Sequence, residues 1–470
     1  MNVFKLLIDG QLVDGASSID VINPATGEVF QQAPRADEVQ LNTAIEAAKN
    51  AFSAWSATAI DYRRELLIKL ADAIDARLGE FAKLLTREQG RPIEQAQGEI
   101  FFCSYTLRLF AGMELAPKVL KEDDNAKVVE YRQPLGVVAT ITPWNFPLLM
   151  VTNKLAPALL AGNTLVIKPA PTTPLTTLML GELCADIFPA GVVNTVVDNN
   201  DLGGLITSDP DVAKVAFTGS TATGKKVLAS SAETLKRLTL ELGGNDAALV
   251  LDDVDVKAVA AQIYNCSTYN AGQICVAIKR VYVPDALYDE FCNELARLAN
   301  NSVVGDGFEP GVQVGPLQNK LQFEKVKRLL EDTKKRGNII AGGEALNRPG
   351  YFIAPTIVRD IDDKAKLVAG EQFAPILPVL KYSDLDDALA RINATEFGLA
   401  GSVWGTDIDR AASVAQRIDS GSVWVNSHMA LDPAVPFRGA KQSGLGVELG
   451  QEGLYEYTQA KVITVPKNSR

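Results

Sequence analysis

Apolar residues recur every three or four positions between residues 62 and 89, at Leu66, Leu70, Ile74, Leu78, Phe81 and Leu85. This period places them on one face of an α-helix. The following Gly90-Arg91-Pro92 is typical of a helix end, because glycine terminates helices and proline does not continue them. The pattern predicts one amphipathic helix from Tyr62 to Gln89, with its apolar face in the core.

A second helix is predicted from Lys320 to Arg336. It ends in three consecutive cations, residues 334–336, just before Gly337. Cations complement the negative end of a helix and glycine commonly caps it. The run therefore indicates a helix end rather than a binding patch.

Short apolar runs in the middle of the chain alternate with helical stretches. They lie at residues 137–142, 165–168, 215–218, 238–241 and 247–251. Repetition of strand, helix and strand predicts an α/β fold with a parallel sheet. The sequence has no internal repeat, low-complexity tract or long linker that would mark domain boundaries.

Length and composition indicate a globular protein of about two to three domains, with 470 residues, 47% of them hydrophobic and 22% charged. The net charge of -11 argues against a broad contact with nucleic acid phosphates or an anionic membrane. We expect neither as a partner.

The cysteine content and the N-terminus bear on the compartment. Five cysteines with no Cys-x-x-Cys spacing indicate reduced thiols in a reducing compartment. Residues 1–10 lack the basic start and long apolar stretch of a signal peptide. No run of eighteen apolar residues suggests a membrane span. The cytoplasm is the expected location.

Cys275 is the predicted nucleophile, because it alone follows a glycine-containing turn of small residues, at 270–277. Catalysis by a thiolate needs a partly exposed sulfur near backbone N–H groups and a base. The other four cysteines lie in helix-like sequences, where buried inert thiols are common, and receive no role: Cys103, Cys184, Cys266 and Cys292.

The base is expected to be a carboxylate. The chain has one histidine, His428, so its inventory argues against histidine-dependent triads and against multi-histidine metal sites. We choose Glu241, in Leu240-Glu241-Leu242-Gly243-Gly244, and predict no metal.

Residues 219–226 nearly match a Walker A phosphate loop, but Lys226 stands where Ser or Thr would hold magnesium. We reject that interpretation. Between a strand that ends at Thr218 and a helix that begins near Thr223, the same glycines can let a dinucleotide pyrophosphate approach the backbone and the helix N-terminus.

Six ordered motifs resemble the aldehyde dehydrogenase superfamily, and further matches run from about Asn23 almost to the C-terminus. The motifs are Pro143-Trp144-Asn145-Phe146-Pro147, Lys168-Pro169-Ala170, residues 217–224, Glu241-Leu242-Gly243-Gly244, Gly272-Gln273-Ile274-Cys275 and residues 371–375. The resemblance implies a Rossmann-type coenzyme domain at residues 1–111 and 135–242, and an α/β catalytic domain at 243–442. It also implies a small β oligomerisation extension with the C-terminal tail, at 112–134 and 443–470.

In that extension, residues 128–132 and 461–465 are the weakly matching strands. The family's extension crosses to a partner subunit. We therefore expect a homodimer or a homotetramer.

The resemblance also assigns the chemistry. The Cys275 thiolate would attack an aldehyde, with the Asn145 side chain and the Cys275 backbone N–H as the oxyanion hole. Hydride would pass to a nicotinamide cofactor, leaving a thioester that Glu241 hydrolyses by activating water. From the residues alone, Asn145 is equally a turn asparagine held between two prolines.

By resemblance, Lys168 would hold the adenosine ribose and Glu371 the nicotinamide ribose, with Phe373 beside the ring. Without it, Lys168 reads as a solvated strand-end lysine and Glu371 as a surface acid. The implied cofactor contacts are Thr142, Trp144, Asn145, Lys168, Ala170, Pro171, Gly219, Ser220, Thr223, Leu242, Glu371 and Phe373. Pro171 stands where many NAD-preferring members carry Glu, so NAD is expected and NADP stays open.

The resemblance places nine residues around the substrate, namely Phe146, Met150, Asn153, Ile274, Val276, His428, Met429, Leu431 and Phe437. Asn153 replaces an aromatic residue of several relatives, and the remaining surface is apolar. The expected substrate is a small hydrophobic aldehyde, whether aliphatic, aryl or indolic, because such a pocket discriminates weakly among them.

Three other functions stay open. A member that passes its acyl group to coenzyme A would not need Glu241 to activate water. A structural or ligand-binding protein of the same fold would not need Cys275, Glu241, Asn145, Lys168 and Glu371 intact. A thiol hydrolase without redox chemistry would leave the strand, turn and helix around residue 219 unexplained.

Overall fold

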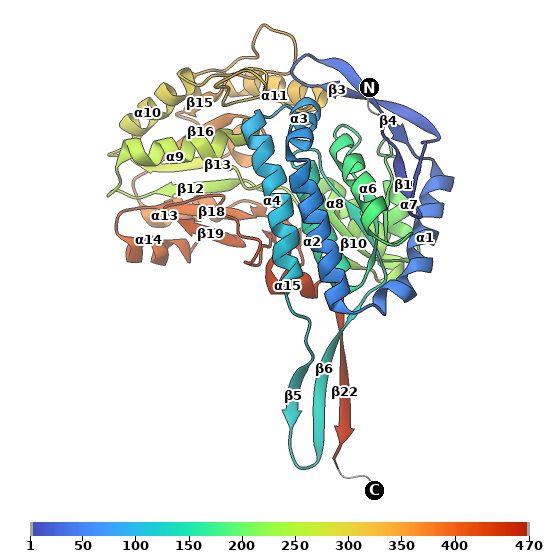
Figure 1. Ribbon diagram of the computed structural model, residues 1–470. Helices are drawn as coiled ribbons and strands as arrows, with labels where there is room; N and C mark the ends of the chain where they lie inside the picture. The colour runs from blue at the N-terminus through green and yellow to red at the C-terminus, as the bar shows by residue number, and fades with distance from the viewer. Residues whose placement is uncertain (1–2, 468–470) are drawn as a thin grey trace.

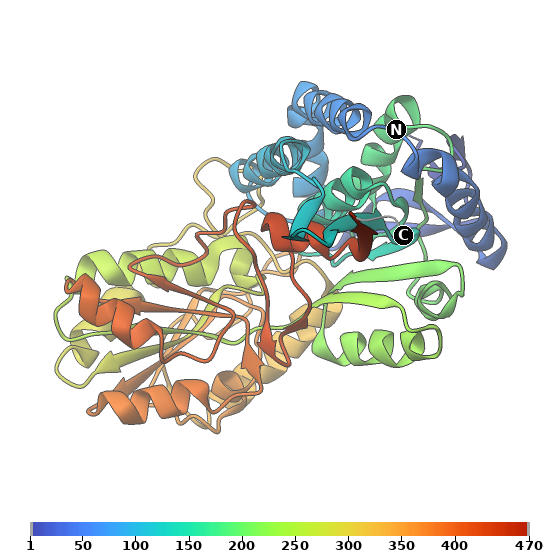
Figure 2. The same ribbon diagram turned by 90° about the horizontal axis from the view of Figure 1, so that it is seen from below.

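A computed structural model describes residues 3–467. Two lobes, each built around its own sheet, stand side by side, and a narrow three-stranded arm projects from below them (Figure 1). Figure 2 views the molecule from the side of the arm, with the N-terminal blue-to-green segments in one lobe and the yellow-to-orange segments in the other.

The first lobe is built on an eight-stranded sheet of order β2-β1-β9-β8-β7-β10-β11-β21. Its five central strands run parallel, namely β9 (Val193–Thr195), β8 (Thr164–Lys168), β7 (Val137–Ile141), β10 (Val212–Thr218) and β11 (Arg237–Glu241). The antiparallel members are β1 (Leu6–Ile8), β2 (Gln11–Val13) and β21 (Gly444–Leu445).

Helices cover this sheet, and a hairpin of β3 (Ser17–Asn23) and β4 (Glu28–Arg35) lies beside it. The helices are α1 (Glu38–Ser56), α2 (Ile60–Ala76), α3 (Leu78–Gln89), α4 (Ile93–Ala111), α5 (Pro147–Ala161), α6 (Leu175–Ile187), α7 (Gly203–Ser208) and α8 (Thr221–Ser231). The short η1 (Ala232–Thr234) leads from α8 into β11.

The second lobe has a seven-stranded sheet of order β14-β15-β16-β13-β12-β18-β19. Its strands are β12 (Asp246–Val250), β13 (Ile278–Pro284), β14 (Asn338–Ala341), β15 (Thr356–Arg359), β16 (Ile376–Tyr382), β18 (Ala400–Trp404) and β19 (Ser422–Val425). Only β14 pairs antiparallel. The helices are α9 (Val256–Thr268), η2 (Tyr269–Gly272), α10 (Tyr288–Asn300), α11 (Lys320–Thr333), α12 (Lys366–Ala369), α13 (Leu385–Asn393) and α14 (Ile408–Ala415).

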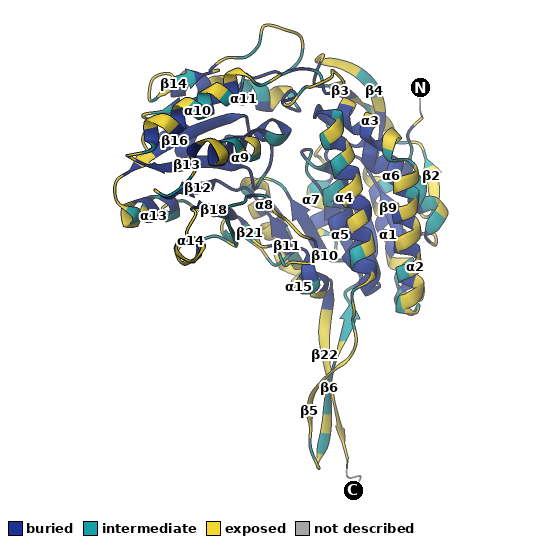
Figure 3. Cartoon of the chain, turned by 60° about the vertical axis from the view of Figure 1, so that its left-hand side comes forward, coloured by how far each residue is buried: buried dark blue, intermediate teal, exposed yellow. Residues whose placement is uncertain are grey.

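The arm consists of β5 (Lys118–Glu122), β6 (Ala126–Pro134) and β22 (Thr458–Pro466), in the order β22-β6-β5. The segments predicted as matching strands pair directly, with Val462 opposite Glu130. Figure 3 shows few buried residues along the arm, in contrast with the two lobes. Near the base of the arm lies α15 (Gly450–Tyr455) (Figure 1). The two-residue strands β17 (Phe397–Gly398) and β20 (Ala440–Lys441) pair with each other as a separate small sheet.

The α/β prediction is confirmed. All five apolar runs are strands, four in the first sheet and residues 247–251 as β12 of the second. Four of these strands are almost wholly buried, because helices and neighbouring segments cover both faces of each mainly parallel sheet. β11 is exposed at its start, Arg237, and buried from Thr239 onward. Within residues 3–467, no helix is both long and apolar enough to cross a membrane.

The single helix predicted from Tyr62 to Gln89 is wrong in one respect, because it is two helices. Arg77, with φ -113° and ψ 17°, leaves the helical conformation between α2 and α3. The break keeps the apolar face in phase, and Leu66, Leu70 and Phe81 are all buried. Periodicity alone therefore did not reveal it.

The second predicted helix ends at Thr333, three residues early. Two of the cations that follow pair with acids of the same helix, Lys334 with Glu331 at 2.7 Å and Arg336 with Asp332 at 3.4 Å. Gly337 is not a left-handed cap: a Cβ there would lie 2.8 Å from Val358 Cγ1, so close packing accounts for the glycine.

Candidate active site

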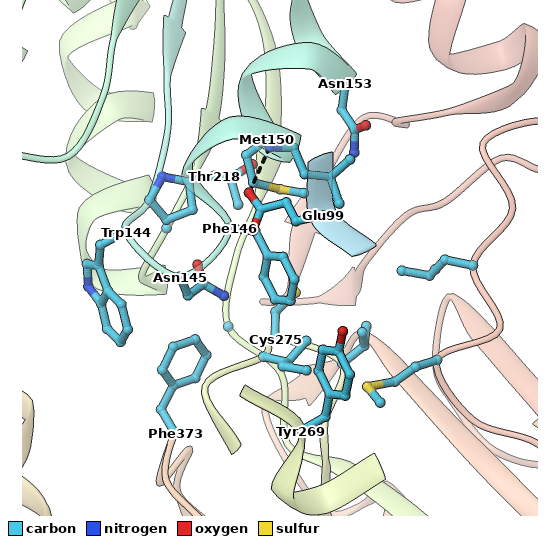
Figure 4. Close-up of a pocket in the computed structure, with 18 of the residues that line it drawn as sticks. Glu99, Trp144, Asn145, Phe146, Met150, Asn153, Thr218, Tyr269, Cys275 and Phe373 are labelled. Atoms are coloured by element: carbon cyan, nitrogen blue, oxygen red, sulfur yellow. Dashed lines mark hydrogen bonds between the residues drawn. The ribbon is translucent and has the colours of Figure 1, made fainter. Parts of the chain in front are cut away.

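A cavity of about 560 Å³ lies between the lobes. Its walls come from α4, the β7–α5 turn, α5, the starts of the segments after β10 and β11, η2 and the loop at residues 428–433. Figure 4 shows side chains from both lobes converging on it, with Cys275 near its centre.

The turn that carries Cys275 has an unusual backbone. Asn270, Ala271 and Gly272 all have positive φ, at 51°, 54° and 71°. A side chain at Gly272 would bring a Cβ within 2.4 Å of the Ala374 carbonyl oxygen, so only glycine fits. A run of left-handed residues that is held by its surroundings is typical of functional sites.

Burial sets the protonation of Cys275. Burial, together with the charges of Glu241, Asp246 and Glu371, raises the pKa of the thiol to about 12, and the charge of Lys279 opposes the shift. Cys275 is partly accessible at the cavity wall. The resting nucleophile at neutral pH is therefore a neutral thiol, and forming the thiolate requires a proton acceptor.

Glu241, at the end of β11, is 5% exposed, and neither carboxylate oxygen has a hydrogen-bond partner among the described residues. Burial, followed by the charge of Glu448, raises its pKa well above 4.5, and Lys154 opposes the shift. Lys154 Nζ donates to Thr218 Oγ1 at 2.6 Å and to Glu448 Oε1 at 2.5 Å. The carboxyl group is thus poised to bind or release a proton well above the usual range of a glutamate.

The two glycines after Glu241 allow a close approach of chain segments. A Cβ at Gly244 would lie 2.5 Å from the Cys275 carbonyl oxygen, and one at Gly243 would lie 2.6 Å from Glu371 Oε2. The Gly244 N–H also donates to Glu371 Oε1 at 3.1 Å. This motif therefore packs directly against both the nucleophile turn and Glu371.

Hydrogen bonds fix Asn145. The side-chain Nδ2 of Asn145 donates to the Gln273 backbone carbonyl at 2.9 Å. The Asn145 backbone carbonyl accepts from the Asn270 side chain at 3.1 Å and from the Arg91 guanidinium. In Figure 4 its amide nitrogen lies on the side facing Cys275. One N–H of the amide remains for a ligand.

A buried ion pair supports this turn. Arg91 Nη1 and Glu99 Oε2 are 2.6 Å apart, both side chains fully buried, and the Arg91 guanidinium lies 4.3 Å from the centre of the Phe146 ring. Glu99 Oε1 accepts from the Leu148 and Leu149 N–H groups at 3.0 Å each, at the start of α5. The carboxylate thereby caps the positive end of that helix.

The proposed cofactor contacts of the first lobe lie along one edge of its sheet, because β7, β8, β10 and β11 end there in parallel. Lys168, at the end of β8, is 4% exposed, and its Nζ is 2.6 Å from Asp198 Oδ1. The solvated-lysine interpretation is therefore wrong. Thr142, after β7, is buried, and its Oγ1 has no partner among the described residues.

Helix α8 begins at Thr221, two residues earlier than predicted, and Ser220 caps it by accepting the Thr223 N–H at 3.2 Å. A Cβ at Gly224 would lie 2.5 Å from Leu242 Cδ2, so this glycine lets the helix pack against the segment after β11. Ser220 and Thr223 are exposed at the helix N-terminus.

Across the cavity, Glu371 is half-buried rather than a surface acid, and burial raises its pKa. The ring of Phe373 packs edge-on against Trp144, with centres 5.4 Å apart. Four features of this edge fit a dinucleotide cofactor. They are the N-terminus of α8, the buried Lys168, the Thr142 hydroxyl and the Glu371 carboxylate with the rings of Trp144 and Phe373. No cluster of three or more metal-ligating side chains occurs in residues 3–467.

Eight of the nine predicted substrate residues line the cavity, the exception being Phe437. The buried Phe437 pairs its backbone with Glu448 at 2.7 and 2.8 Å. His428 lies in an irregular loop as predicted, with Nε2 2.8 Å from the Val276 carbonyl and its ring against Trp424. Glu241 is not part of the cavity lining, but its charge is close enough to Cys275 to raise the pKa of the thiol.

The model of the aldehyde dehydrogenase family matches residues 12–463. The chain belongs to this family. It is 38% identical to "Aldehyde dehydrogenase LUC3" of Fusarium sp, over 99% of both chains. An aldehyde dehydrogenase from Bacillus cereus solved as its NAD+ complex is 35% identical with a TM-score of 0.97, over 99% of this chain and 97% of that one. An E. coli "NADP dependent enzyme" is 36% identical with a TM-score of 0.95, over 98% of both chains.

Membership makes this chain an NAD(P)-dependent aldehyde dehydrogenase whose substrate is a small-molecule aldehyde. Several wall residues of this aldehyde dehydrogenase went unnoticed in the sequence, chiefly Gly98, Glu99, Phe102, Thr106, Leu149, Tyr269, Gln322 and Lys325. Gly98, Phe102 and Thr106 are four residues apart and share one face of α4, which was a usable signal. Nothing in the sequence showed that this face meets a cavity.

Proposed function

We propose that this aldehyde dehydrogenase oxidises a hydrophobic aldehyde to the carboxylic acid through a thiohemiacetal and a thioester on Cys275. The proposal rests on one arrangement: a partly accessible thiol at a cavity wall, a fixed Asn145 amide beside it, and a buried Glu241 carboxyl group that has no hydrogen-bond partner among the described residues. The Glu241 charge is close enough to raise the pKa of the thiol. Each group matches one step of the chemistry.

In the first half-reaction, Cys275 Sγ forms a bond to the aldehyde carbon, and the thiol proton passes to a base, for which Glu241 is the nearby candidate. The carbonyl oxygen becomes an oxyanion that the Asn145 amide and the Cys275 N–H stabilise. Bound nicotinamide supplies the hydride acceptor. Lys168, Ser220, Glu371 and the aromatic rings beside it would hold that cofactor.

In the second half-reaction, Glu241, once it has released the first proton to solvent, accepts a proton from water as the water oxygen attacks the thioester carbon. The C–S bond then breaks, the sulfur takes this proton back from Glu241, and the carboxylic acid is released while Cys275 returns to a thiol. Both carboxylate oxygens of Glu241 lack a hydrogen-bond partner within residues 3–467, which leaves them available for this proton.

The direct test is formation of reduced cofactor from NAD and, separately, NADP with aliphatic, aryl and indolic aldehydes in the absence of coenzyme A. We expect turnover of hydrophobic aldehydes and release of the free acid. Turnover that requires coenzyme A and yields an acyl thioester would contradict the role of Glu241. No turnover under either condition would favour a non-catalytic protein.

We propose NAD as the preferred cofactor. Pro171 has no carboxylate to place near Lys168. Asp198, in the segment after β9, provides one instead. Asp198 is fully buried and also accepts the Leu202 N–H at 2.9 Å. The Lys168 charge is therefore already paired, and a 2′-phosphate would meet a net neutral pair instead of a free cation.

Asp198→Asn is expected to raise the affinity for NADP relative to NAD by roughly tenfold, because it frees the Lys168 charge and removes a nearby anion. Titration calorimetry of both cofactors measures this ratio without turnover. Asp201→Asn is the matched control, since Asp201 is exposed and paired with Arg35. An unchanged ratio in Asp198→Asn would contradict the assignment.

We propose that the three largest sheets mark three domains, with a coenzyme domain at residues 1–111 and 135–242, a catalytic domain at 243–442 and an extension at 112–134 and 443–470. β21 is an exception, because it lies in the tail but pairs with β11 of the first sheet; residues 1–2 and 468–470 lie outside the described part. The five free thiols suit a reducing compartment, and we propose the cytoplasm.

We propose that the arm joins subunits into a homodimer or homotetramer. Its exposed apolar side chains are Val119, Leu120, Tyr131, Val462, Ile463 and Val465. Such an apolar surface on a projecting sheet with open edges is typical of an interface.

Val462→Glu is expected to lower the molar mass in solution toward the 50.5 kDa of one chain, because it buries a charge at the proposed contact. Light scattering after size exclusion measures the mass. Val29→Glu is the control, since Val29 is 51% exposed on β4, against 54% for Val462. A wild-type chain that is already monomeric would refute the interface.

A further inference from the structure

One polar side chain interrupts the apolar wall formed by α5. Asn153 lines the cavity and is 8% exposed, yet its Oδ1 is fully buried without a hydrogen-bond partner among the described residues. Its cavity-lining neighbours on the same helix are Phe146, at the helix start, Leu149 and Met150. An amide in this position leaves hydrogen-bonding capacity unused.

A second unpaired group lines the same cavity from the adjacent helix. Thr106 on α4 is completely buried, and its Oγ1 has no partner among the described residues. Helices α4 and α5 pack against each other. An unmatched polar group in an apolar wall costs free energy, so the Asn153 amide, which keeps some exposure in the cavity, indicates that a ligand supplies its partner. The Thr106 hydroxyl is too deeply buried to serve a ligand itself.

We infer that the substrate carries a hydroxyl group remote from its aldehyde, and that this hydroxyl hydrogen-bonds to the Asn153 amide. The inference rests on the proposed function and names its substrate class. A hydroxyl both donates and accepts, so it satisfies the amide in either of its two orientations, which are nearly identical in shape.

A charged group is a poorer match at this position. Glu99, on the cavity wall, and Lys154, which follows Asn153 on α5, are both already paired: Glu99 with Arg91 at 2.6 Å and Lys154 with Glu448 at 2.5 Å. A carboxylate or ammonium beside Asn153 would therefore be buried without a counter-ion, which is strongly unfavourable. A neutral hydroxyl avoids that cost.

The position of Asn153 indicates the length of the substrate. It lies six residues after Pro147, where α5 begins, so about 9 Å of helix separate it from the turn of Asn145. Figure 4 shows Asn153 on the far side of the cavity from Trp144 and Phe373. The rings of Phe102, Phe146 and Tyr269 also line the wall. A hydroxylated aryl aldehyde fits both this span and the aromatic wall.

The test compares kcat/KM for hydroxybenzaldehydes and methylbenzaldehydes substituted at the same ring position, using wild-type enzyme and Asn153→Leu. We expect the wild type to favour the hydroxyl compound at one or more positions. Asn153→Leu, of similar volume, is expected to lower that ratio by roughly tenfold or more, through loss of the hydroxyl compound rather than the methyl compound.

Met150→Leu is the matched control and is expected to leave the ratio unchanged, since it alters the wall without altering its hydrogen bonds. If Asn153→Leu does not fold, Asn153→Ala gives the same comparison without a steric clash. Equal kcat/KM for both compounds in the wild type, or a ratio preserved in the Asn153 variants, overturns the subsite alone. Absence of turnover with every aldehyde overturns the proposed function as well.

Discussion

Cys275→Ala is expected to abolish aldehyde oxidation, lowering the rate of reduced-cofactor formation by roughly 10⁴-fold or more, in line with the loss of other covalent nucleophiles. Without the sulfur no thiohemiacetal forms, and among the described residues the cavity lining holds no other cysteine. Cys275 is part of the wall rather than the packed core, so the variant should fold. Thermal unfolding beside the activity assay checks this point.

Cys266→Ala is the matched control for Cys275→Ala. Cys266 is half-buried on α9, with Sγ 3.6 Å from the His428 carbonyl oxygen on the cavity loop. It is thus a thiol near the same site but without access to Asn145 or Glu241. An equal loss of activity in both variants, or substantial activity in Cys275→Ala, would remove Cys275 from the mechanism.

Glu241→Gln is expected to block the hydrolytic half-reaction, lowering steady-state turnover by roughly 10²–10⁴-fold, the range typical of a positioned base. Thioester formation would then outpace its hydrolysis. A first-turnover burst of reduced cofactor should persist if another group or solvent accepts the thiol proton. Rapid-mixing kinetics, with mass spectrometry of the acylated chain, would detect the trapped thioester at Cys275.

The raised pKa of Glu241 also gives a pH signature. A base acts only when unprotonated, and burial raises the pKa of this carboxyl well above 4.5. Wild-type turnover should therefore fall as the pH drops through that raised value, and this decrease at acidic pH should be absent in Glu241→Gln. Glu448→Gln removes the neighbouring anion that raises the Glu241 pKa, so in this variant the decrease should occur at lower pH. A wild-type rate independent of pH, with Glu241→Gln fully active, would contradict the assignment.

Several features of the site could be predicted because they depend on residues close together in the sequence. The strand ends at Lys168, Thr218 and Glu241 followed from short apolar runs. The turn before Cys275 followed from a glycine among small residues, whereas the left-handed backbone of Asn270 and Ala271 was visible only in the structure. The proposed nucleophile and its candidate base were chosen from the turn and the inventory of side chains, since a chain with one histidine has few alternatives.

Other features could not be predicted, because they join residues far apart in the chain. The Asp198 partner of Lys168 is thirty residues away, and Arg91, which is paired with Glu99 of α4, supports Asn145 from the loop between α3 and α4. Asn153 could be assigned to the pocket, but the sequence did not show that its amide is unpaired there.

The sequence by itself determined the α/β architecture and the family, and it was enough to propose one thiol and one carboxylate for catalysis, because local periodicity, turn chemistry and composition carry that information. Only the tertiary structure decided the protonation of those groups and the polarity of the cavity. The pKa values of Cys275 and Glu241 depend on burial and on charges brought together from both lobes and the C-terminal segment, through contacts that chain folding alone creates.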